Sequence, residues 1–260
     1  MSVVLENVTK IVTVLGAPSK LFDGLNLEID RGMRIGVLAL PKTGKTTLLK
    51  LVCGTDRQFE GKIRRGMNIS WPIPNTDFLA PASSLAWNIR WLARAYGVKD
   101  PDFARTVAKI GAFEDYVNGP LAKAPQSVRP QLGFAVGIAM DFDLYLFDQQ
   151  AVPQIKEYKD AGLVHLKERT AGKAILVATS LPQMVLDCCE QAFVLERGRL
   201  TPFADLKEGV DYFKAMQKAD ADKQKEAAAN KKADDGEGES VSDENEKGVE
   251  LVQAAIGDII

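Results

Sequence analysis

The sequence predicts an α/β fold in which a parallel β-sheet carries a helical insertion. Near-continuous apolar runs, typical of buried parallel strands, lie at 33–40, 143–148 and 174–178. The first run leads into a glycine-containing loop and then into an apolar helical pattern. About 100 residues separate the first run from the second, and two helical patterns occupy much of that interval.

Periodicity and turn residues place the other elements in order. The N-terminal thirty residues alternate as strands do, and the turn Asp30-Arg31-Gly32 leads into the first buried strand. The predicted elements are strands at 3–5, 11–15, 25–29 and 33–40, a loop at 41–47, a helix from 48, helices over 84–96 and 101–110, strands at 143–148 and 174–178, and a hairpin at 192–198.

Length and composition suit a soluble protein with one large domain or two small ones. The chain has 260 residues, of which 46% are apolar and 26% charged. No apolar run approaches the roughly 20 residues of a membrane helix. The N-terminus does not resemble a secretion signal, so we expect a cytoplasmic protein. Three cysteines without metal-ligand spacing are interpreted as buried or half-buried free thiols: Cys53, Cys188 and Cys189.

The net charge of −2 combines two unlike parts. Residues 217–260 carry twelve acids and six bases, a net charge of −6, so residues 1–216 carry +4. Half of the 32 residues in 217–248 are charged and none is aromatic, which predicts an acidic disordered or transiently helical linker. Residues 249–260 are apolar again, with helical spacing, and form either a short docking segment or a fraying end.

The loop after the first buried strand has the composition of a phosphate-binding loop. Its predicted nucleotide ligands are Lys42, Thr43, Gly44, Lys45, Thr46 and Thr47. Lys45 would neutralise phosphate charge, while the Thr46 hydroxyl and Asp148, at the end of the second buried strand, would hold Mg²⁺. The pattern is imperfect, because Ala39 stands where its first glycine is expected. A methyl group there is tolerated if the local φ is negative.

Further stretches of residues 2–213 resemble the ATP-binding subunits of ABC transporters, most closely those of capsular-polysaccharide exporters. The more specific pieces are the Ser-Trp-Pro step within 66–72, the Asn-x-Arg helix start within 88–97, and 142–148. The resemblance implies a P-loop NTPase fold over 1–216, with an N-terminal antiparallel β subdomain and a helical subdomain at about 78–140. It also implies ATP with Mg²⁺ as cofactor and a head-to-tail dimer.

Several positions at which that family performs its chemistry differ here. Gln149 replaces the catalytic glutamate, and an amide cannot take a proton from water, which typically costs about 10²–10⁴ in rate. Thr179 replaces the switch histidine. Residues 125–128 stand where the signature loop is expected, Ala80 where the Q-loop glutamine is expected, and Gln154 where the D-loop aspartate is expected. No aromatic residue occupies the place near Ile11 where the family stacks the adenine.

Three functions follow as hypotheses. The first is a pseudo-ATPase of the exporter family that acts through nucleotide binding or protein contacts. The second is a working exporter ATPase with atypical motifs, and the third is a P-loop binding module unrelated to transport. The resemblance implies a homodimer or a heterodimer with another ABC subunit, and a membrane-subunit contact through 78–97 that would place the chain at the inner face of the membrane. The interleaved charges of the linker give no support to nucleic-acid binding.

Overall fold

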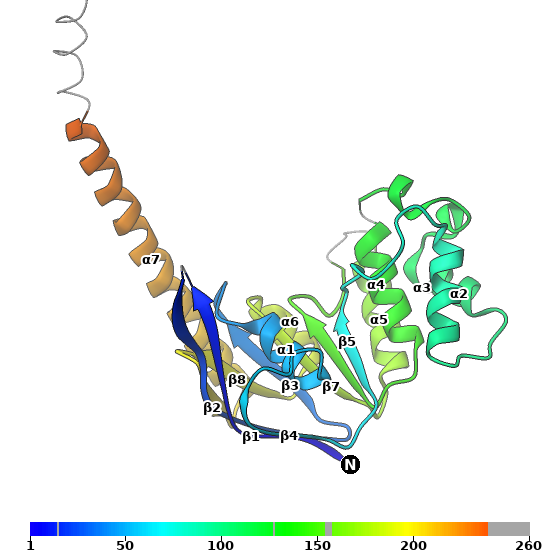
Figure 1. Ribbon diagram of the computed structural model, residues 1–260, viewed down its shortest axis with the longest axis horizontal. Helices are drawn as coiled ribbons and strands as arrows, with labels where there is room; N and C mark the ends of the chain where they lie inside the picture. Colours follow the sequence, from blue (N-terminus) through cyan, green and yellow to red (C-terminus); the bar gives the residue numbers. More distant parts are fainter. Residues whose placement is uncertain (15, 127, 154–157, 239–260) are drawn as a thin grey trace, which may run out of the picture. The chain divides into compact units, whose positions relative to one another are not determined.

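The computed structural model describes residues 1–14, 16–126, 128–153 and 158–238. Its internal contacts divide the chain into two units, Met1–Phe213 and Lys214–Ile260. The first unit contains both β-sheets, and the helices α1 to α6 lie around them (Figure 1).

A three-stranded antiparallel sheet forms the N-terminal layer, in the order β2-β1-β4. The separate strands predicted at 3–5 and 11–15 are one strand, so that prediction was wrong; Leu15 lies outside the described residues. Register shifts, the first between Leu5 and Val8, interrupt the alternation without ending the strand, as β-bulges do. The strands are β1 (Ser2–Val14), β2 (Ala17–Asp30) and β4 (Glu60–Arg65).

A six-stranded sheet in the order β5-β6-β7-β3-β8-β9 forms the second layer. Neighbouring strands from β5 to β8 are parallel, and β9 runs antiparallel to β8. The predicted α/β class and buried strands are confirmed, and the carboxyl ends of β3, β6 and β7 meet at one edge. The strands are β3 (Arg34–Ala39), β5 (Ile69–Ile73), β6 (Leu144–Asp148), β7 (Ala174–Thr179), β8 (Gln191–Glu196) and β9 (Arg199–Phe203).

Helix α1 (Lys45–Cys53) joins the two sheets through one hydrophobic core. Its buried residues pack with inward-facing side chains of β1, β2, β3 and β6. The helix ends at Gly54, whose φ of +83° suits a glycine C-cap. The Arg65 guanidinium donates to the carbonyls of Leu51 and Val52, which fixes β4 against the end of α1.

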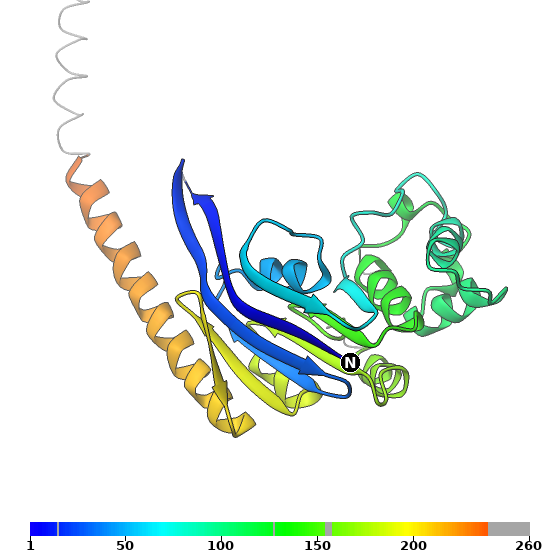
Figure 2. The ribbon, with the colours of Figure 1, turned by 60° about the horizontal axis from the view of Figure 1, so that its bottom comes forward.

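The helical insertion lies beyond β5, at one end of the six-stranded sheet (Figures 1 and 2). The helices predicted over 84–96 and 101–110 are present as α2 and α3, whereas α4 was not predicted as a helix. The helices are α2 (Leu85–Ala95), α3 (Phe103–Gly111), α4 (Val128–Ala139) and α5 (Lys159–Arg169), with short 3₁₀ turns at Glu114–Tyr116 and Leu121–Lys123; α6 (Pro182–Cys188) packs instead on β3 and β7.

The linker predicted over 217–248 is helical in its first part. Helix α7 spans Leu206–Gly238, so of the two states expected for this segment, disordered or transiently helical, the structure has the helical one up to Gly238. Alanine and lysine are the most frequent residues in this stretch and proline is missing from it, which favours helix. Residues 239–248 and the apolar segment 249–260 lie outside the described residues.

The predicted state of the cysteines is confirmed. All three are free; Cys188 and Cys189 are buried, and Cys53 is half-buried. Burial raises the pKa of the Cys188 thiol to about 11, so this sulfur stays protonated and unreactive at neutral pH. Within the described ranges, no helix is long and apolar enough to cross a bilayer.

One buried ion pair joins β1 of the N-terminal sheet to the segment between α1 and β4. Lys10 Nζ lies 2.9 Å from the Asp56 carboxylate and 2.7 Å from the Gln58 carbonyl, and the Lys10 side chain is only 7% exposed. Burial alone would raise the pKa of Asp56, but hydrogen bonds from Lys10 and from the Gln58 N–H hold this pKa below 3.8. The pair therefore stabilises the fold above about pH 4, and its contribution is lost as the pH falls through the lowered pKa.

We expect Asp56→Asn to lower the free energy of unfolding by about 3 kcal/mol at pH 7, because it leaves the Lys10 ammonium buried without a counter-charge. Urea unfolding measures the change. The matched control is Asp141→Asn, which removes the partner of Lys173 from a pair whose carboxylate side chain is 88% exposed, and should cost less than about 1 kcal/mol. Equal losses in both variants would contradict this account.

Candidate functional site

The predicted phosphate loop joins the carboxyl end of β3 to the first turn of α1. Gly44 caps α1 with a φ of +102°, and a Cβ there would lie 2.9 Å from the Phe22 ring. Lys42 has a φ of +65°, a left-handed conformation that costs a non-glycine residue about 1 kcal/mol. The Thr43 hydroxyl donates to the Leu40 carbonyl over 2.7 Å and closes the turn. Ala39 stands in extended backbone at the end of β3, so its methyl group is tolerated.

Lys45 extends over this loop. Its Nζ donates to the carbonyl oxygens of Ala39, at 3.1 Å, and Leu40, at 2.8 Å. A lysine ammonium has three donors, so one N–H is left for a phosphate oxygen. Burial lowers the pKa of Lys45, and the nearby Asp148 carboxylate opposes this effect. The loop therefore holds its positive charge in a fixed place.

The two predicted magnesium ligands lie together. The Thr46 hydroxyl donates to Asp148 Oδ2 over 2.6 Å, from the first turn of α1 to the carboxyl end of β6. One hydroxyl and one carboxylate suit Mg²⁺, which takes its remaining oxygen ligands from phosphates and water. No cluster of three acidic, histidine or cysteine side chains that could hold a metal by itself occurs in the described part of the chain. Thr47 is half-buried in the same turn.

Gln149 and Thr179 are bonded to their surroundings at the ends of β6 and β7. Gln149 has a φ of +68°, and its side-chain amide bonds to the hydroxyl and the N–H of Ser180. The fully buried Thr179 donates from its hydroxyl to the Gln149 carbonyl at 2.7 Å and accepts from the Leu181 N–H at 2.9 Å. Neither side chain is a base, so the place beside Asp148 holds neutral hydrogen-bonding groups.

Two adjoining cavities open beside the Thr46–Asp148 pair. One of about 520 Å³ reaches from Lys45 to Gln149, and the other, of about 420 Å³, extends along α1 to Trp71 and Phe78. Asn75 and Asp77 line both cavities, and sequence reasoning missed them. Asn75 Oδ1 accepts from the Asp77 N–H over 2.8 Å, an Asx turn that the Pro-Asn-Thr-Asp sequence after a strand could have indicated.

Close packing and a buried amide hold the loop between β5 and α2. A Cβ at Gly133 of α4 would lie 2.2 Å from the Pro74 carbonyl oxygen, so only glycine lets α4 pack there. Asn88 is fully buried, and its amide both accepts from the Ala80 N–H and donates to the Ala80 carbonyl. This contact gives the asparagine of the Asn-x-Arg piece a structural role, although the helix begins earlier, at Leu85. The loop that contributes Asn75 and Asp77 to both cavities is therefore fixed.

An aromatic cluster stabilises the same wall. The Trp71 ring lies 5.4–5.7 Å from the rings of Phe78, Tyr96 and Phe142. Ser70 is fully buried and accepts from the Leu146 N–H over 2.9 Å, which joins β5 to β6 next to Pro72, a residue without an N–H. The Ser-Trp-Pro step thus has a structural role.

The remaining predicted positions lie elsewhere. The Val128 N–H at the start of α4 donates to the Pro125 carbonyl over 2.9 Å, and Pro130 in the same turn has no N–H. Ser127 and Gln154 lie outside the described residues. Ile11 is 53% exposed on β1. Within the described ranges, the structure therefore brings together the Lys45, Thr46, Asp148, Gln149 and Thr179 positions, and Pro125, Gln126 and Val128 are not among the residues that line the two cavities there.

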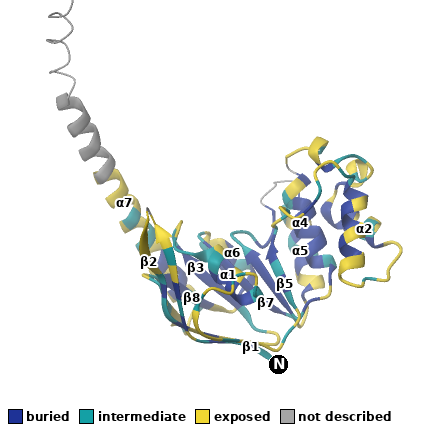
Figure 3. Cartoon of the chain, viewed as in Figure 1, coloured by how far each residue is buried: buried dark blue, intermediate teal, exposed yellow. Residues whose placement is uncertain are grey.

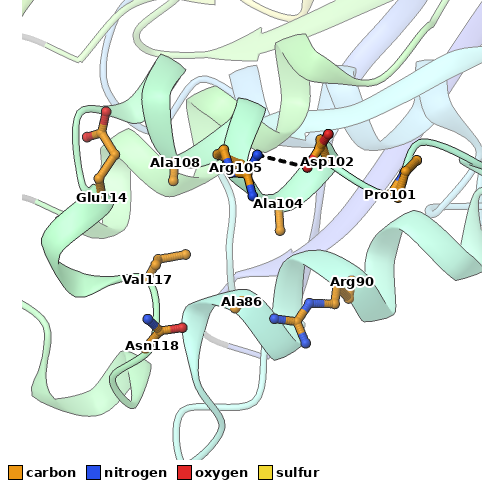
Figure 4. Close-up of a pocket in the computed structure, with 10 residues that line it drawn as sticks. All are labelled: Ala86, Arg90, Pro101, Asp102, Ala104, Arg105, Ala108, Glu114, Val117 and Asn118. Atoms are coloured by element: carbon orange, nitrogen blue, oxygen red, sulfur yellow. Dashed lines mark ion pairs between the residues drawn. The ribbon is translucent and has the colours of Figure 1, made fainter.

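A further cavity of about 340 Å³ lies between α2 and α3 (Figure 4). Its floor contains small alanine side chains, and its charged lining residues are Arg90, Asp102, Arg105 and Glu114. Asp102 and Arg105 form an ion pair over 3.1 Å, drawn as the dashed line in Figure 4. Among the described residues, its lining contains neither a histidine nor a cysteine nor a hydroxyl nucleophile, so these side chains offer no chemistry comparable to the Lys45 site.

Comparison with curated proteins finds relatives in polysaccharide export. The chain is 29% identical over 195 residues to the ATP-binding protein BexA of Haemophilus influenzae, covering 75% of this chain and 89% of BexA. It is 26% identical to the capsule polysaccharide export ATP-binding protein CtrD of Neisseria meningitidis serogroup B, covering 74% and 89%. It is 25% identical over 222 residues to the polysialic acid transport ATP-binding protein KpsT of Escherichia coli, covering 83% and 98%.

Solved structures share the fold. The ATP-binding subunit of an ABC transporter superposes with a TM-score of 0.70 at 18% identity, covering 82% of this chain and all of that one. The bacterial ABC transporter cassette MJ0796, solved as a dimer, superposes with a TM-score of 0.65 at 17% identity, covering 76% and 96%. No protein-family model matches the chain.

Proposed function

We propose that this chain, which has the fold of an ABC ATPase cassette and is homologous to the ATP-binding proteins of capsule polysaccharide export, is a degenerate subunit that holds Mg²⁺-ATP without hydrolysing it. It acts through the conformation and contacts of the nucleotide-bound form. The observation that carries the proposal is the contrast between an assembled phosphate and metal site and the neutral Gln149–Ser180–Thr179 cluster beside it.

The binding half of the proposal rests on three side chains. Lys45 keeps an N–H for the nucleotide phosphates, and Thr46 and Asp148 are already within hydrogen-bonding distance of each other. When bound, Mg²⁺ would neutralise phosphate charge. Because these groups are positioned by β3, β6 and α1, little reorganisation is needed for binding.

The proposed loss of hydrolysis rests on the lack of a side chain in this cluster that can accept a proton from the attacking water. Gln149 follows Asp148, in the place of the glutamate that the resemblance implies, and its amide has no basic site at neutral pH. The Thr179 hydroxyl both donates and accepts hydrogen bonds inside the fold, so it is committed there. No side chain of this cluster can take a proton from an attacking water.

A partner subunit in a dimer would restore ATP hydrolysis only in part. In a head-to-tail dimer, the 125–128 turn of this chain would serve the partner's nucleotide. Pro125 and Pro130 have no N–H, and the Val128 N–H is bonded to the Pro125 carbonyl. Among the described residues of this segment, these three backbone positions offer no N–H to a phosphate, so we expect a site that depends on it to be slow even with an intact partner.

We propose a homodimer or a heterodimer with another ABC subunit, together with a membrane subunit contacted through 78–97. Support comes from the dimeric MJ0796 cassette and from the export functions named for the relatives. The chain would then lie in the cytoplasm, peripheral to the inner face of the membrane. Docking of 249–260 on a partner also stays a proposal.

The working ATPase is a second candidate, because the Lys45, Thr46 and Asp148 positions are intact. Turnover of Mg²⁺-ATP by the purified chain separates the two. We expect the wild-type rate to equal that of Lys45→Ala within error, because the Gln149–Ser180–Thr179 cluster supplies no base. A rate typical of an ABC ATPase that is abolished by Lys45→Ala would refute the pseudo-ATPase and establish the second candidate. The P-loop module unrelated to transport would be favoured if 78–97 contacts no membrane subunit.

A further inference from the structure

The surface that continues outward from the phosphate loop is formed by the ends of β1 and β2. A Cβ at Gly44 would lie 2.9 Å from the Phe22 ring and 3.1 Å from the Leu21 side chain, so β2 packs directly against the loop. Phe22 is fully buried, and its ring therefore has no free face for a ligand. Beyond it, residues 11–14 and 16–20 are exposed or half-buried, and Figure 3 shows this end of the two strands as largely exposed.

The strand register shows which side chains share the face of Phe22. Lys10 lies opposite Phe22, and directly opposite residues of an antiparallel pair lie on the same face, to which every second residue of a strand returns. Val12 therefore belongs to this face and is half-buried, whereas Ile11 and Thr13, on the other face, are exposed. Four small side chains, which we call the hairpin face, continue it beyond Phe22: Val12 with Ser19 opposite, and Val14 with Ala17 opposite.

A nucleotide bound at the phosphate loop would extend toward the hairpin face. In a bound nucleoside triphosphate the magnesium ion bridges the β- and γ-phosphates, so the Thr46–Asp148 pair marks the γ end. Asp148 ends β6, which lies on the β7 side of β3. The other neighbour of β3 is β8, and β2 lies on that side, since the Asp23 N–H donates over 2.9 Å to the Gly198 carbonyl in the turn after β8. The nucleoside would therefore point away from Asp148 and toward β2.

The hairpin face carries no group that distinguishes one nucleobase from another. Three of its side chains are aliphatic and contact any base alike, and the Ser19 hydroxyl both donates and accepts, so it suits an amino group as well as a carbonyl. Residues 11–20 contain no aromatic residue and no amide or carboxylate side chain, the groups that read the edge of a base. Lys20 lies opposite Ile11 on the other face and pairs with Asp23.

We propose that this site selects its ligand by the Mg²⁺-triphosphate and not by the base, so that purine and pyrimidine nucleoside triphosphates bind alike. The inference rests on the proposed function and extends it from ATP to nucleoside triphosphates as a class. The groups that supply affinity are Lys45, Thr46 and the first N–H groups of α1, and all of them meet phosphate or its metal. The rings of Trp71 and Phe78 line the cavity beside Asp148, at the γ end and away from the base.

Isothermal titration of the full chain with the Mg²⁺ complexes of ATP, GTP, CTP, UTP and inorganic tripolyphosphate tests the proposal. We expect the four nucleotides to bind within about threefold of one another, and tripolyphosphate within about tenfold of them, because the base contributes little. Lys45→Ala should weaken binding of every member about a hundredfold. One nucleotide bound more than about tenfold tighter than the others would overturn the inference and leave the proposed function standing. If no member binds, the proposed function fails and the inference fails with it.

Val12→Tyr supplies the missing ring on the hairpin face. We expect it to raise the affinity for all four nucleotides about tenfold, because any base can stack on an aromatic ring, and to leave tripolyphosphate, which has no base, unchanged. The matched control, Thr13→Tyr, places the same ring on the other face of β1 and should change affinity less than about twofold. Urea unfolding checks that both variants are folded. No increase for any nucleotide in folded Val12→Tyr, or an equal increase in Thr13→Tyr, would overturn the inference.

Discussion

Lys45→Ala is expected to lower the affinity for Mg²⁺-ATP about a hundredfold. The ammonium is held over the phosphate loop by the carbonyls of Ala39 and Leu40, which leaves one N–H directed to a ligand. Its removal loses a charge-assisted hydrogen bond and uncovers two loop carbonyls that would face the phosphates. Isothermal titration of the wild type and the variant with Mg²⁺-ATP measures the difference.

Two controls make this result specific. Lys62→Ala removes an exposed lysine from β4 and should leave the affinity unchanged within about a factor of two. Urea unfolding without nucleotide should show the same stability for Lys45→Ala as for the wild type within about 1 kcal/mol, because the side chain is half-buried and its partners are loop carbonyls. An affinity for ATP that does not depend on Lys45 would contradict nucleotide binding at this loop.

Gln149→Glu is expected to raise ATP turnover at least tenfold above the wild-type background. The position can accept a carboxylate, because the Ser180 N–H and hydroxyl that now meet the Gln149 amide can both donate to one. A general base alone contributes about 10²–10⁴ in rate. The increase in turnover should lie toward or below the lower end of this range, since Thr179 and the proline-containing segment 125–128 are unchanged.

Gln149→Ala is the control, because it removes the amide without supplying a base, and its turnover should equal the wild-type background. The gain in Gln149→Glu must also disappear when it is combined with Lys45→Ala. A wild-type rate that is already high, and that Gln149→Glu leaves unchanged, would show that proton transfer occurs by another route. That outcome would favour the working ATPase.

Taken together, these results would describe a nucleotide-dependent contact subunit. Mg²⁺-ATP bound at the Lys45 loop would stabilise one conformation without being consumed. The Asn75 and Asp77 wall of the two cavities connects this site to the Trp71 cluster and so, through Tyr96, to the end of α2. Occupancy of the phosphate loop could thereby change the presentation of α2 to its partners, and Trp71 emission during an ATP titration would report it.

Local patterns were sufficient for the elements whose residues repeat without interruption. The buried strands β3, β6 and β7 and the amphipathic helices α2 and α3 follow from apolar periodicity. Elements with interrupted patterns were missed. β1 passes through bulges, β4 is almost wholly exposed, and α4 is buried on nearly all sides, so none of them shows a simple period.

Sequence by itself determined the chemical identity of the site. Three features can be read from the sequence without the tertiary structure: a Gly-Lys-Thr loop after a buried strand, an aspartate at the end of a second strand, and an amide in the next position. They predict a phosphate and magnesium site without a base. Only the tertiary structure decided what surrounds it: the bonding of Gln149 to Ser180, the approach of Asn75 and Asp77, and the packing of Phe22 against Gly44. These features depend on the packing of segments distant in the sequence, and local periodicity carries no information about such packing.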